Sequence, residues 1–291
     1  MLTFRQFGLI TEGGNIKVGD VSANDITMTP KNRPSVTNDI HDALHAMHNA
    51  YHSATGNHLF GKDAKGLKTG SIFAGSTNHL MDKNISHAEF AKHKPKVGDL
   101  DIKINRDHAD DFIANHAKPG TKFGKYTVVG SKKGAGTHHL LMKHDNGEVH
   151  QFDMMKAEYH DHEPSKFEQM SNNSNWQDVK SGIKGKHHKI LLNAAGRSTH
   201  KFSTMYGLGS RTDAKKPWIN DPKEITHELF GPKANHGDID SFHGVTQLIK
   251  KHIPKQHHQE IYDKFKADVL KQPGDHAKAI DHLRTHLEVK D

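Results

Sequence analysis

The sequence predicts an α+β fold: a mixed sheet flanked by helices, followed by a C-terminal helical bundle. Short apolar segments bounded by turn residues lie between residues 71 and 156, as expected for the strands of one sheet. Beyond residue 165 strand patterns fade and helical patterns dominate. We therefore divide the chain into an N-terminal arm (1–36), a sheet-containing domain (37–165) and a mainly helical domain (166–291).

The composition is that of a polar, folded protein. Hydrophobic residues make up 33% of the 291 residues and charged residues 26%. No apolar run approaches the roughly 20 residues that cross a bilayer, and the start of the chain lacks a secretory signal pattern. There is no cysteine, which excludes disulfides, thiolate metal ligands and cysteine nucleophiles. A cytoplasmic location without membrane attachment is the simplest expectation.

Lysine and arginine exceed aspartate and glutamate by 41 to 34, giving a net charge of +7 and a pI near 9.2. This balance favours polyanionic partners such as RNA. The charges are dispersed along the chain, so a solvated basic surface explains them equally well. A basic RNA-binding module is therefore an alternative, although aromatic stacking platforms are few, at 7% of residues.

The first helix is expected to follow an extended arm that is ordered only by docking, with one short helix at its start. Thr37 or Asn38 can cap the helix, and Gly56 can end it. Its apolar stripe consists of Ile40, Leu44, Met47 and Tyr51.

Two histidine-rich patterns invite a metal interpretation that their spacing does not favour. One helical face carries His41, His45, His48 and His52. A straight stripe does not supply the converging geometry that imidazole ligands need. Metal binding is not favoured at His160-Asp161-His162-Glu163 either, and we interpret this segment as a solvated loop.

The segment 57–71 superficially resembles a phosphate-binding P-loop. That motif places lysine directly after its second glycine, whereas Leu67 follows Gly66, and no apolar strand precedes Gly61. A flexible basic loop is the expectation.

The sheet region contains five predicted strands and one helix. The strands are SIFAG (71–75), VGDLDIKI (97–104), KYTVVGSK (125–132), THHLLMKH (137–144) and EVHQFDMMK (148–156). Asn146-Gly147 between the last two predicts a tight antiparallel hairpin. Helical character around residues 86–93 gives the first part a β-α-β order.

The last part of the chain is predicted to be helical. Residues 166–182 resemble a polar loop or irregular helix, and the apolar segment 187–196 fits a short helix or a strand. Asp221-Pro222 predicts a helix start and Gly231 its end. Three further helices are expected at 241–252, 257–271 and 276–287.

The candidate chemistry lies on two of the strands. Strand alternation places Asp99, Asp101 and Lys103 on one face of VGDLDIKI. In VHQFDMM it places Asp153 on one face and Glu148 on the other, so Asp153 is the better third ligand. If the two strands are neighbours, three carboxylates meet and repel unless a cation joins them. Mg²⁺ suits such hard oxygen ligands, and Mn²⁺ is a substitute.

A turn upstream completes the pattern. SIFAGSTN is an apolar strand ending in Gly75-Ser76, where backbone amides and a hydroxyl can hold a triphosphate. Taken singly, the Asp-Leu-Asp motif fits a solvated strand face and the Gly-Ser pair fits an ordinary turn. Together they resemble the nucleotidyltransferase superfamily of the DNA polymerase β type, over roughly residues 70–156.

The resemblance implies a role for each residue. Gly75 and Ser76 would hold the β and γ phosphates, Asp99 and Asp101 would bind two Mg²⁺ ions, and Asp153 would bind the ion that activates the attacking hydroxyl. The implied reaction moves a nucleoside monophosphate from a nucleoside triphosphate, ATP, CTP or another, to a hydroxyl of RNA, a small molecule or a protein. Pyrophosphate leaves.

One interval departs from the family pattern. Ser76 and Asp99 are 23 positions apart, about twice the usual interval, so Gly70-Ser71 remains a substitute for the turn. The resemblance also implies that helices after the sheet contact the base or the acceptor. Basic candidates there are Lys201, Arg211, Lys215 and Lys216.

The opening MLTFRQF resembles the starts of many tailed-phage proteins. This implies the host cytoplasm as location and a second alternative, a phage structural or host-interaction protein that keeps the fold without turnover. The three aspartates argue for retained activity.

Overall fold

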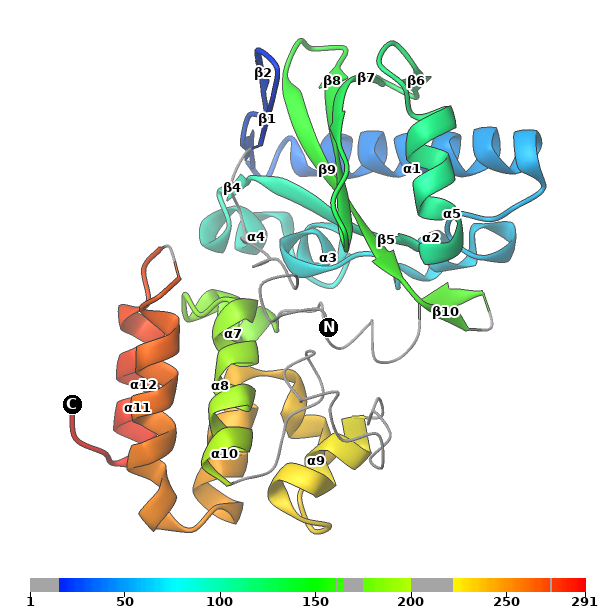
Figure 1. Ribbon diagram of the computed structural model, residues 1–291. Helices are drawn as coiled ribbons and strands as arrows, with labels where there is room; N and C mark the ends of the chain where they lie inside the picture. Colours follow the sequence, from blue (N-terminus) through cyan, green and yellow to red (C-terminus); the bar gives the residue numbers. More distant parts are fainter. Residues whose placement is uncertain (1–15, 161, 165–174, 200–221, 273) are drawn as a thin grey trace. The chain divides into compact units, whose positions relative to one another are not determined.

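The computed structural model describes residues 16–160, 162–164, 175–199, 222–272 and 274–291 (Figure 1). Its contacts divide the chain into two units, Met1–Ser165 and Lys166–Asp291. The first unit contains a mixed five-stranded sheet with helices, and the described part of the second is helical. The predicted α+β class is confirmed at this level.

The central sheet has the strand order β5-β9-β8-β7-β6. Its strands are β5 (Asp99–Asn105), β9 (Val149–Ala157), β8 (Thr137–His144), β7 (Tyr126–Lys132) and β6 (Lys122–Phe123). β5 and β9 run parallel, and every other pair is antiparallel. The β5–β9 register sets Asp101 directly opposite Asp153.

The β8–β9 hairpin is confirmed where it was predicted. Gly147 adopts a φ of +96°, which favours glycine, and its N–H donates to the carbonyl of His144 over 2.8 Å. The predicted strand SIFAG is wrong: only Phe73 pairs with the sheet, through one antiparallel bridge to Ile102. Gly70 and Gly75, both at positive φ, turn the chain on either side of this bridge.

Helix α1 (Arg33–Thr55) begins four residues before the predicted Thr37, because Pro34 fits the first turn of a helix. It ends at Gly56 as expected. The expected basic loop 57–71 is instead partly helical. It forms the short helices η2 (Lys62–Ala64) and α2 (Lys65–Thr69), with Leu67 buried.

The described part of the arm is docked, in agreement with its expected dependence on other elements. Its elements are β1 (Lys17–Val18), β2 (Val21–Ser22) and β3 (Ile26–Thr27). β1 and β2 pair with each other, and β3 pairs with β4 (Lys96–Val97). The short helix expected at the start of the chain lies outside the described residues.

Helices pack beside the strands that carry the aspartates. α3 (Gly75–Met81) contacts β5, and α5 (Arg106–Asp111) contacts β5 and β9. α5 continues into the π-helix η3 (Phe112–His116). The predicted helix at 86–93 is α4 (His87–His93), capped by Ser86, which accepts a hydrogen bond from the backbone of Glu89.

One buried arginine fixes the end of α3. The Arg33 guanidinium donates to the backbone carbonyls of His79, Leu80, Asp82 and Ile85 at 2.6–3.0 Å. These bonds satisfy carbonyls at the C-terminal end of α3, where a positive charge is also favoured by the helix dipole. α3, and with it Gly75 at its first position, is thereby tied to α1.

The second unit has its own hydrophobic core. Its elements are α7 (Trp176–Lys180), α8 (Gly185–Ser198), α9 (Pro222–Phe230), η5 (His236–Asp240), α10 (Phe242–His252), η6 (Lys255–His257), α11 (His258–Val269) and α12 (Ala277–Leu287). The unassigned segment 187–196 lies within α8, and the helix predicted to end at Gly231 is α9. Asp221 lies outside the described residues.

Among the described helices, none is long and apolar enough to span a bilayer.

Candidate metal centre

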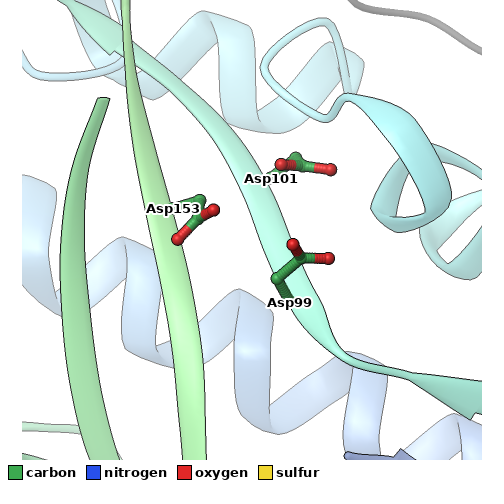
Figure 2. A group of neighbouring side chains, drawn as sticks. All are labelled: Asp99, Asp101 and Asp153. Atoms are coloured by element: carbon green, nitrogen blue, oxygen red, sulfur yellow. The ribbon is translucent and has the colours of Figure 1, made fainter. Parts of the chain in front are cut away.

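The three predicted carboxylates converge on one face of the sheet. Asp99 and Asp101 extend from β5 and Asp153 from β9, toward the same space (Figure 2). One ligand oxygen from each lies within 4.8 Å of the other two. Alternation explains the arrangement: Leu100 and Ile102 are fully buried in the core, so the aspartates point to the other face.

Neighbouring side chains hold Asp153 in place. Its Oδ1 accepts a hydrogen bond from Gln151 Nε2 at 2.8 Å and lies 2.7 Å from His139 Nδ1. His139 sits directly opposite Asp153 on β8, and Gln151 shares its strand face. Asp153 is only 8% exposed, so its carboxylate is fixed in a largely desolvated position.

The Gly75-Ser76 turn lies beside Asp101. Gly75 has a φ of +51°, and a Cβ at this position would lie 2.3 Å from Asp101 Oδ2. Only glycine lets the backbone approach the carboxylate this closely. Ser76 follows as a half-buried residue in the first turn of α3. Ser71, the alternative, follows α2, and its hydroxyl accepts from Thr69 Oγ1 and donates to the carbonyl of Gly66.

Two buried polar groups connect β5 to this turn. Thr77 Oγ1 accepts a hydrogen bond from the Asp101 backbone N–H at 2.8 Å. The Lys103 ammonium donates to the carbonyls of Ser71 and Phe73, both at 3.1 Å, and the side chain is 1% exposed. The segment before Gly75 is therefore fixed to the strand that carries the aspartates.

The donor set suits a hard divalent cation. Among the described residues, this is the one group in which three histidine or carboxylate ligand atoms come together. Carboxylate oxygens are the ligands that Mg²⁺ prefers, and three of them leave coordination positions for water or phosphate oxygens. Bringing three negative groups this close is costly without a positive charge to share. The residues present therefore fit Mg²⁺ or Mn²⁺.

The twenty-three-residue interval before Asp99 contains defined structure. It holds most of α3, together with α4, which corresponds to the helix predicted at 86–93, and β4. Since β4 pairs with β3, the added length also provides a docking edge for the arm.

Sequence reasoning missed the role of His139. The segment THHLLMKH places two histidines side by side, and alternation sends them to opposite faces without saying which one faces the aspartates. His138 is buried on the other face, where its Nε2 lies 2.7 Å from Asp110. Only the β8–β9 register, which pairs His139 with Asp153, separates the two histidines.

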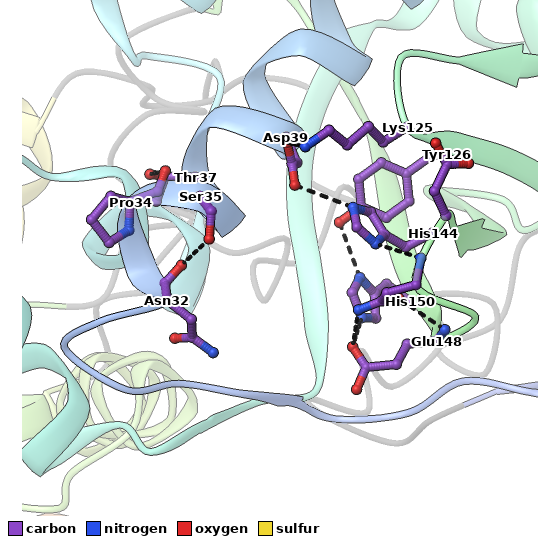
Figure 3. Close-up of polar contacts among 12 residues, drawn as sticks. Asn32, Pro34, Ser35, Thr37, Asp39, Lys125, Tyr126, His144, Glu148 and His150 are labelled. Atoms are coloured by element: carbon purple, nitrogen blue, oxygen red, sulfur yellow. Dashed lines mark hydrogen bonds and ion pairs between the residues drawn. The ribbon is translucent and has the colours of Figure 1, made fainter.

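A second polar cluster occupies the opposite face of the sheet (Figure 3). Asp39 of α1 accepts from the Lys125 ammonium at 2.9 Å and lies 3.2 Å from His144 Nε2. Tyr126 Oη and His150 Nδ1 are 3.1 Å apart, and burial lowers the pKa of His150. His150 Nε2 lies 3.4 Å from Glu148. These contacts join α1 to the sheet and account for the cluster structurally.

The histidine stripe of α1 is partly buried. His48 is buried, and burial, followed by the neighbouring histidines, lowers its pKa to about 4. The rings of His52 and His58 stack 4.3 Å apart. His160 and Glu163 belong to the strand pair β10 (Tyr159–His160) and β11 (Glu163–Pro164), not to a loop. Asp161 lies outside the described residues.

Two further features lie apart from the carboxylates. A shallow polar hollow of about 640 Å³ is lined by residues of the β3–β4 region and the β8–β9 turn, and none of the three aspartates lines it. The basic candidates Lys201, Arg211, Lys215 and Lys216 lie outside the described residues.

No protein-family model, curated protein or solved structure matches this chain.

Proposed function

We propose that this chain is a magnesium-dependent nucleotidyltransferase that moves a nucleoside monophosphate from a nucleoside triphosphate to an acceptor hydroxyl. The observation that carries the proposal is the convergence of Asp99, Asp101 and Asp153, with ligand oxygens within 4.8 Å of one another. The approach of Gly75 to Asp101 supports it, because it brings a backbone turn next to the carboxylates.

The arrangement of elements is compatible with a nucleotidyltransferase-like fold. A short extended segment bridges antiparallel to β5, turns at Gly75 and enters α3. The third carboxylate comes from β9, which lies parallel to β5. We further propose that the C-terminal helices, which share a hydrophobic core, form a bundle.

In the proposed reaction the acceptor oxygen forms a bond to the α-phosphorus while the bond from that phosphorus to the β-phosphate oxygen breaks. Pyrophosphate leaves, and the hydroxyl proton passes to water. Asp99, Asp101 and Asp153 would hold Mg²⁺. When bound, these ions supply charge stabilisation for the entering and leaving oxygens. Gly75 and Ser76 would orient the β and γ phosphates, and the acceptor would be RNA, a small molecule or a protein.

The test is label transfer. Purified protein is incubated with each α-labelled nucleoside triphosphate, Mg²⁺ and, separately, cellular RNA, protein or small-molecule fractions. We expect label in one fraction, lost in Asp101→Asn and kept in Asp107→Asn, an exposed aspartate of α5.

Other results would contradict the proposal. RNA binding that persists without metal and in Asp101→Asn would indicate a basic RNA-binding module. Assembly with virion components, together with absent nucleotide and RNA binding, would indicate a phage structural or host-interaction protein.

A further inference from the structure

The described start of the arm lies against the sheet face that carries the carboxylates. The N–H of Asn24 donates to the carbonyl of Val149 at 2.7 Å, and Asn24 Oδ1 accepts from the N–H of Val149 at 3.2 Å. Val18 packs on Gly130 of β7, where an added Cβ would lie 3.2 Å from the valine side chain. Segment 16–24 is therefore held at both β9 and β7.

Gln151 connects this segment to the candidate metal centre. Its Oε1 accepts from the backbone N–H of Ile16 at 2.8 Å, and its Nε2 donates to Asp153 Oδ1 at 2.8 Å. A backbone N–H can only donate and a carboxylate can only accept, so the two partners dictate the orientation of the amide. The side chain is 2% exposed, so water does not readily replace either partner.

The two carboxylate oxygens of Asp153 differ in their hydrogen bonds. Among the described residues, the donors to this carboxylate, Gln151 and His139, both approach Oδ1. Oδ2 is therefore the oxygen that keeps its acceptor capacity for a cation. Partners of this kind fix the orientation of a ligand and raise the affinity of a metal site.

We infer that Gln151 is a positioning residue that couples docking of segment 16–24 to the cation affinity of the carboxylates. The inference rests on the metal site of the proposed function. Loss of the Ile16 contact frees the Gln151 amide to rotate, and Asp153 then loses a fixed donor. Because coupling between two binding events is reciprocal, a bound cation also stabilises the docked segment.

The first test compares Mn²⁺ affinities of the full-length chain by calorimetry. Gln151→Leu removes both hydrogen bonds and should weaken binding by roughly 10- to 100-fold, the usual effect of losing a partner of a metal ligand. Of the two Gln151 hydrogen bonds, Ile16→Pro removes only the one from the Ile16 N–H, and we expect about tenfold weaker binding. Ile16→Ala keeps the N–H and is its matched control, with affinity within about twofold of the wild type.

The second test uses hydrogen exchange on the full chain. Saturating Mg²⁺ should slow exchange of the amides in segment 16–24 of the wild type and leave them unchanged in Gln151→Leu. Exchange in the rest of the sheet reports whether each variant is folded. If Gln151→Leu does not fold, the comparison of Ile16→Pro with Ile16→Ala decides the question.

The outcomes separate the two proposals. Equal Mn²⁺ affinities for wild type, Gln151→Leu and Ile16→Pro would overturn the coupling while leaving the nucleotidyltransferase proposal intact. The expected affinity pattern without nucleotide transfer would support the coupling and contradict the function. A wild-type chain that binds no divalent cation would overturn both.

Discussion

The carboxylate cluster of the first unit and a buried histidine pair of the second unit place ionisable groups in opposite settings. In the first, three carboxylates of the same charge converge within 4.8 Å on one sheet face. In the second, the buried rings of His187 and His276 lie in a chain of hydrogen bonds that neutral rings can satisfy. Crowded like charges weaken a fold unless a ligand shares them, whereas satisfied neutral rings strengthen it. The difference supports the proposed binding role of the first cluster and favours a structural role for the second.

The histidine chain of the second unit is complete. The Lys184 N–H donates to His187 Nδ1 at 3.0 Å, so the proton of His187 is on Nε2. That group donates to His276 Nδ1 at 3.0 Å, and His276 Nε2 donates to the carbonyl of Gln272 at 2.8 Å. Both rings are neutral in this arrangement. Burial lowers the pKa of His187 to about 3, which agrees with the tautomers.

The largest effect is expected at Gly75. Gly75→Ala places a methyl group 2.3 Å from the Asp101 carboxylate and strains a backbone at φ +51°. Nucleotide transfer should fall at least 1000-fold, about 4 kcal/mol in transition-state energy. Gly56→Ala is the matched control, because Gly56 has a φ of +75° and open space around its Cβ position. Similar activity losses in both variants would show that strain, not contact with Asp101, matters.

Acid should destabilise the second unit. The pKa of His188, whose Nε2 donates to the carbonyl of Ile239, is lowered by burial to about 4, and that of His187 to about 3. Between these values and about 6.5 the unfolded chain binds more protons, so stability falls as pH falls. From pH 7 to 5 we expect a loss of about 2 kcal/mol per histidine.

Tryptophan fluorescence during urea unfolding measures this loss, because both tryptophans, Trp176 and Trp218, belong to residues 166–291. Unfolding midpoints between pH 7 and 8 serve as the control and should agree. A midpoint that stays constant down to pH 5 would show that the buried rings are not neutral.

Removal of the buried Lys103 ammonium tests whether this positive charge stabilises the fold of the first unit. Lys103→Met keeps the apolar stem but leaves the carbonyls of Ser71 and Phe73 without this donor. We expect a loss of about 3 kcal/mol in the free energy of unfolding, measured by chemical denaturation. Lys143→Met, an exposed lysine of β8, is the control and should change stability by less than about 0.5 kcal/mol.

The smallest effect concerns the hydroxyl of the turn. Ser76→Ala should reduce kcat/KM for the nucleoside triphosphate by about tenfold, because one phosphate hydrogen bond is lost. Ser71→Ala should leave it unchanged, since Ser71 is engaged with α2. A loss of activity in Ser71→Ala but not in Ser76→Ala would indicate that Gly70-Ser71 holds the phosphates.

Local patterns predicted β5, β7, β8, β9 and the three aspartates because strand alternation depends on neighbouring residues alone. The segment SIFAG is as apolar as the true strands, and its burial beside two positive-φ glycines, not strand pairing, explains that composition. The contact between Ile16 and Gln151 spans 135 residues and involves a backbone amide, which carries no side-chain signature. The choice of His139 over His138 depended on register, which the sequence leaves open.

The central claim is that Asp99, Asp101 and Asp153 bind a divalent cation. Anomalous diffraction from a crystal soaked in Mn²⁺ tests it most directly. We predict an anomalous peak about 2.1 Å from oxygens of the three carboxylates, and no such peak in Asp101→Asn. Ordered carboxylates without a peak at saturating Mn²⁺, or an equal peak in Asp101→Asn, would contradict the account.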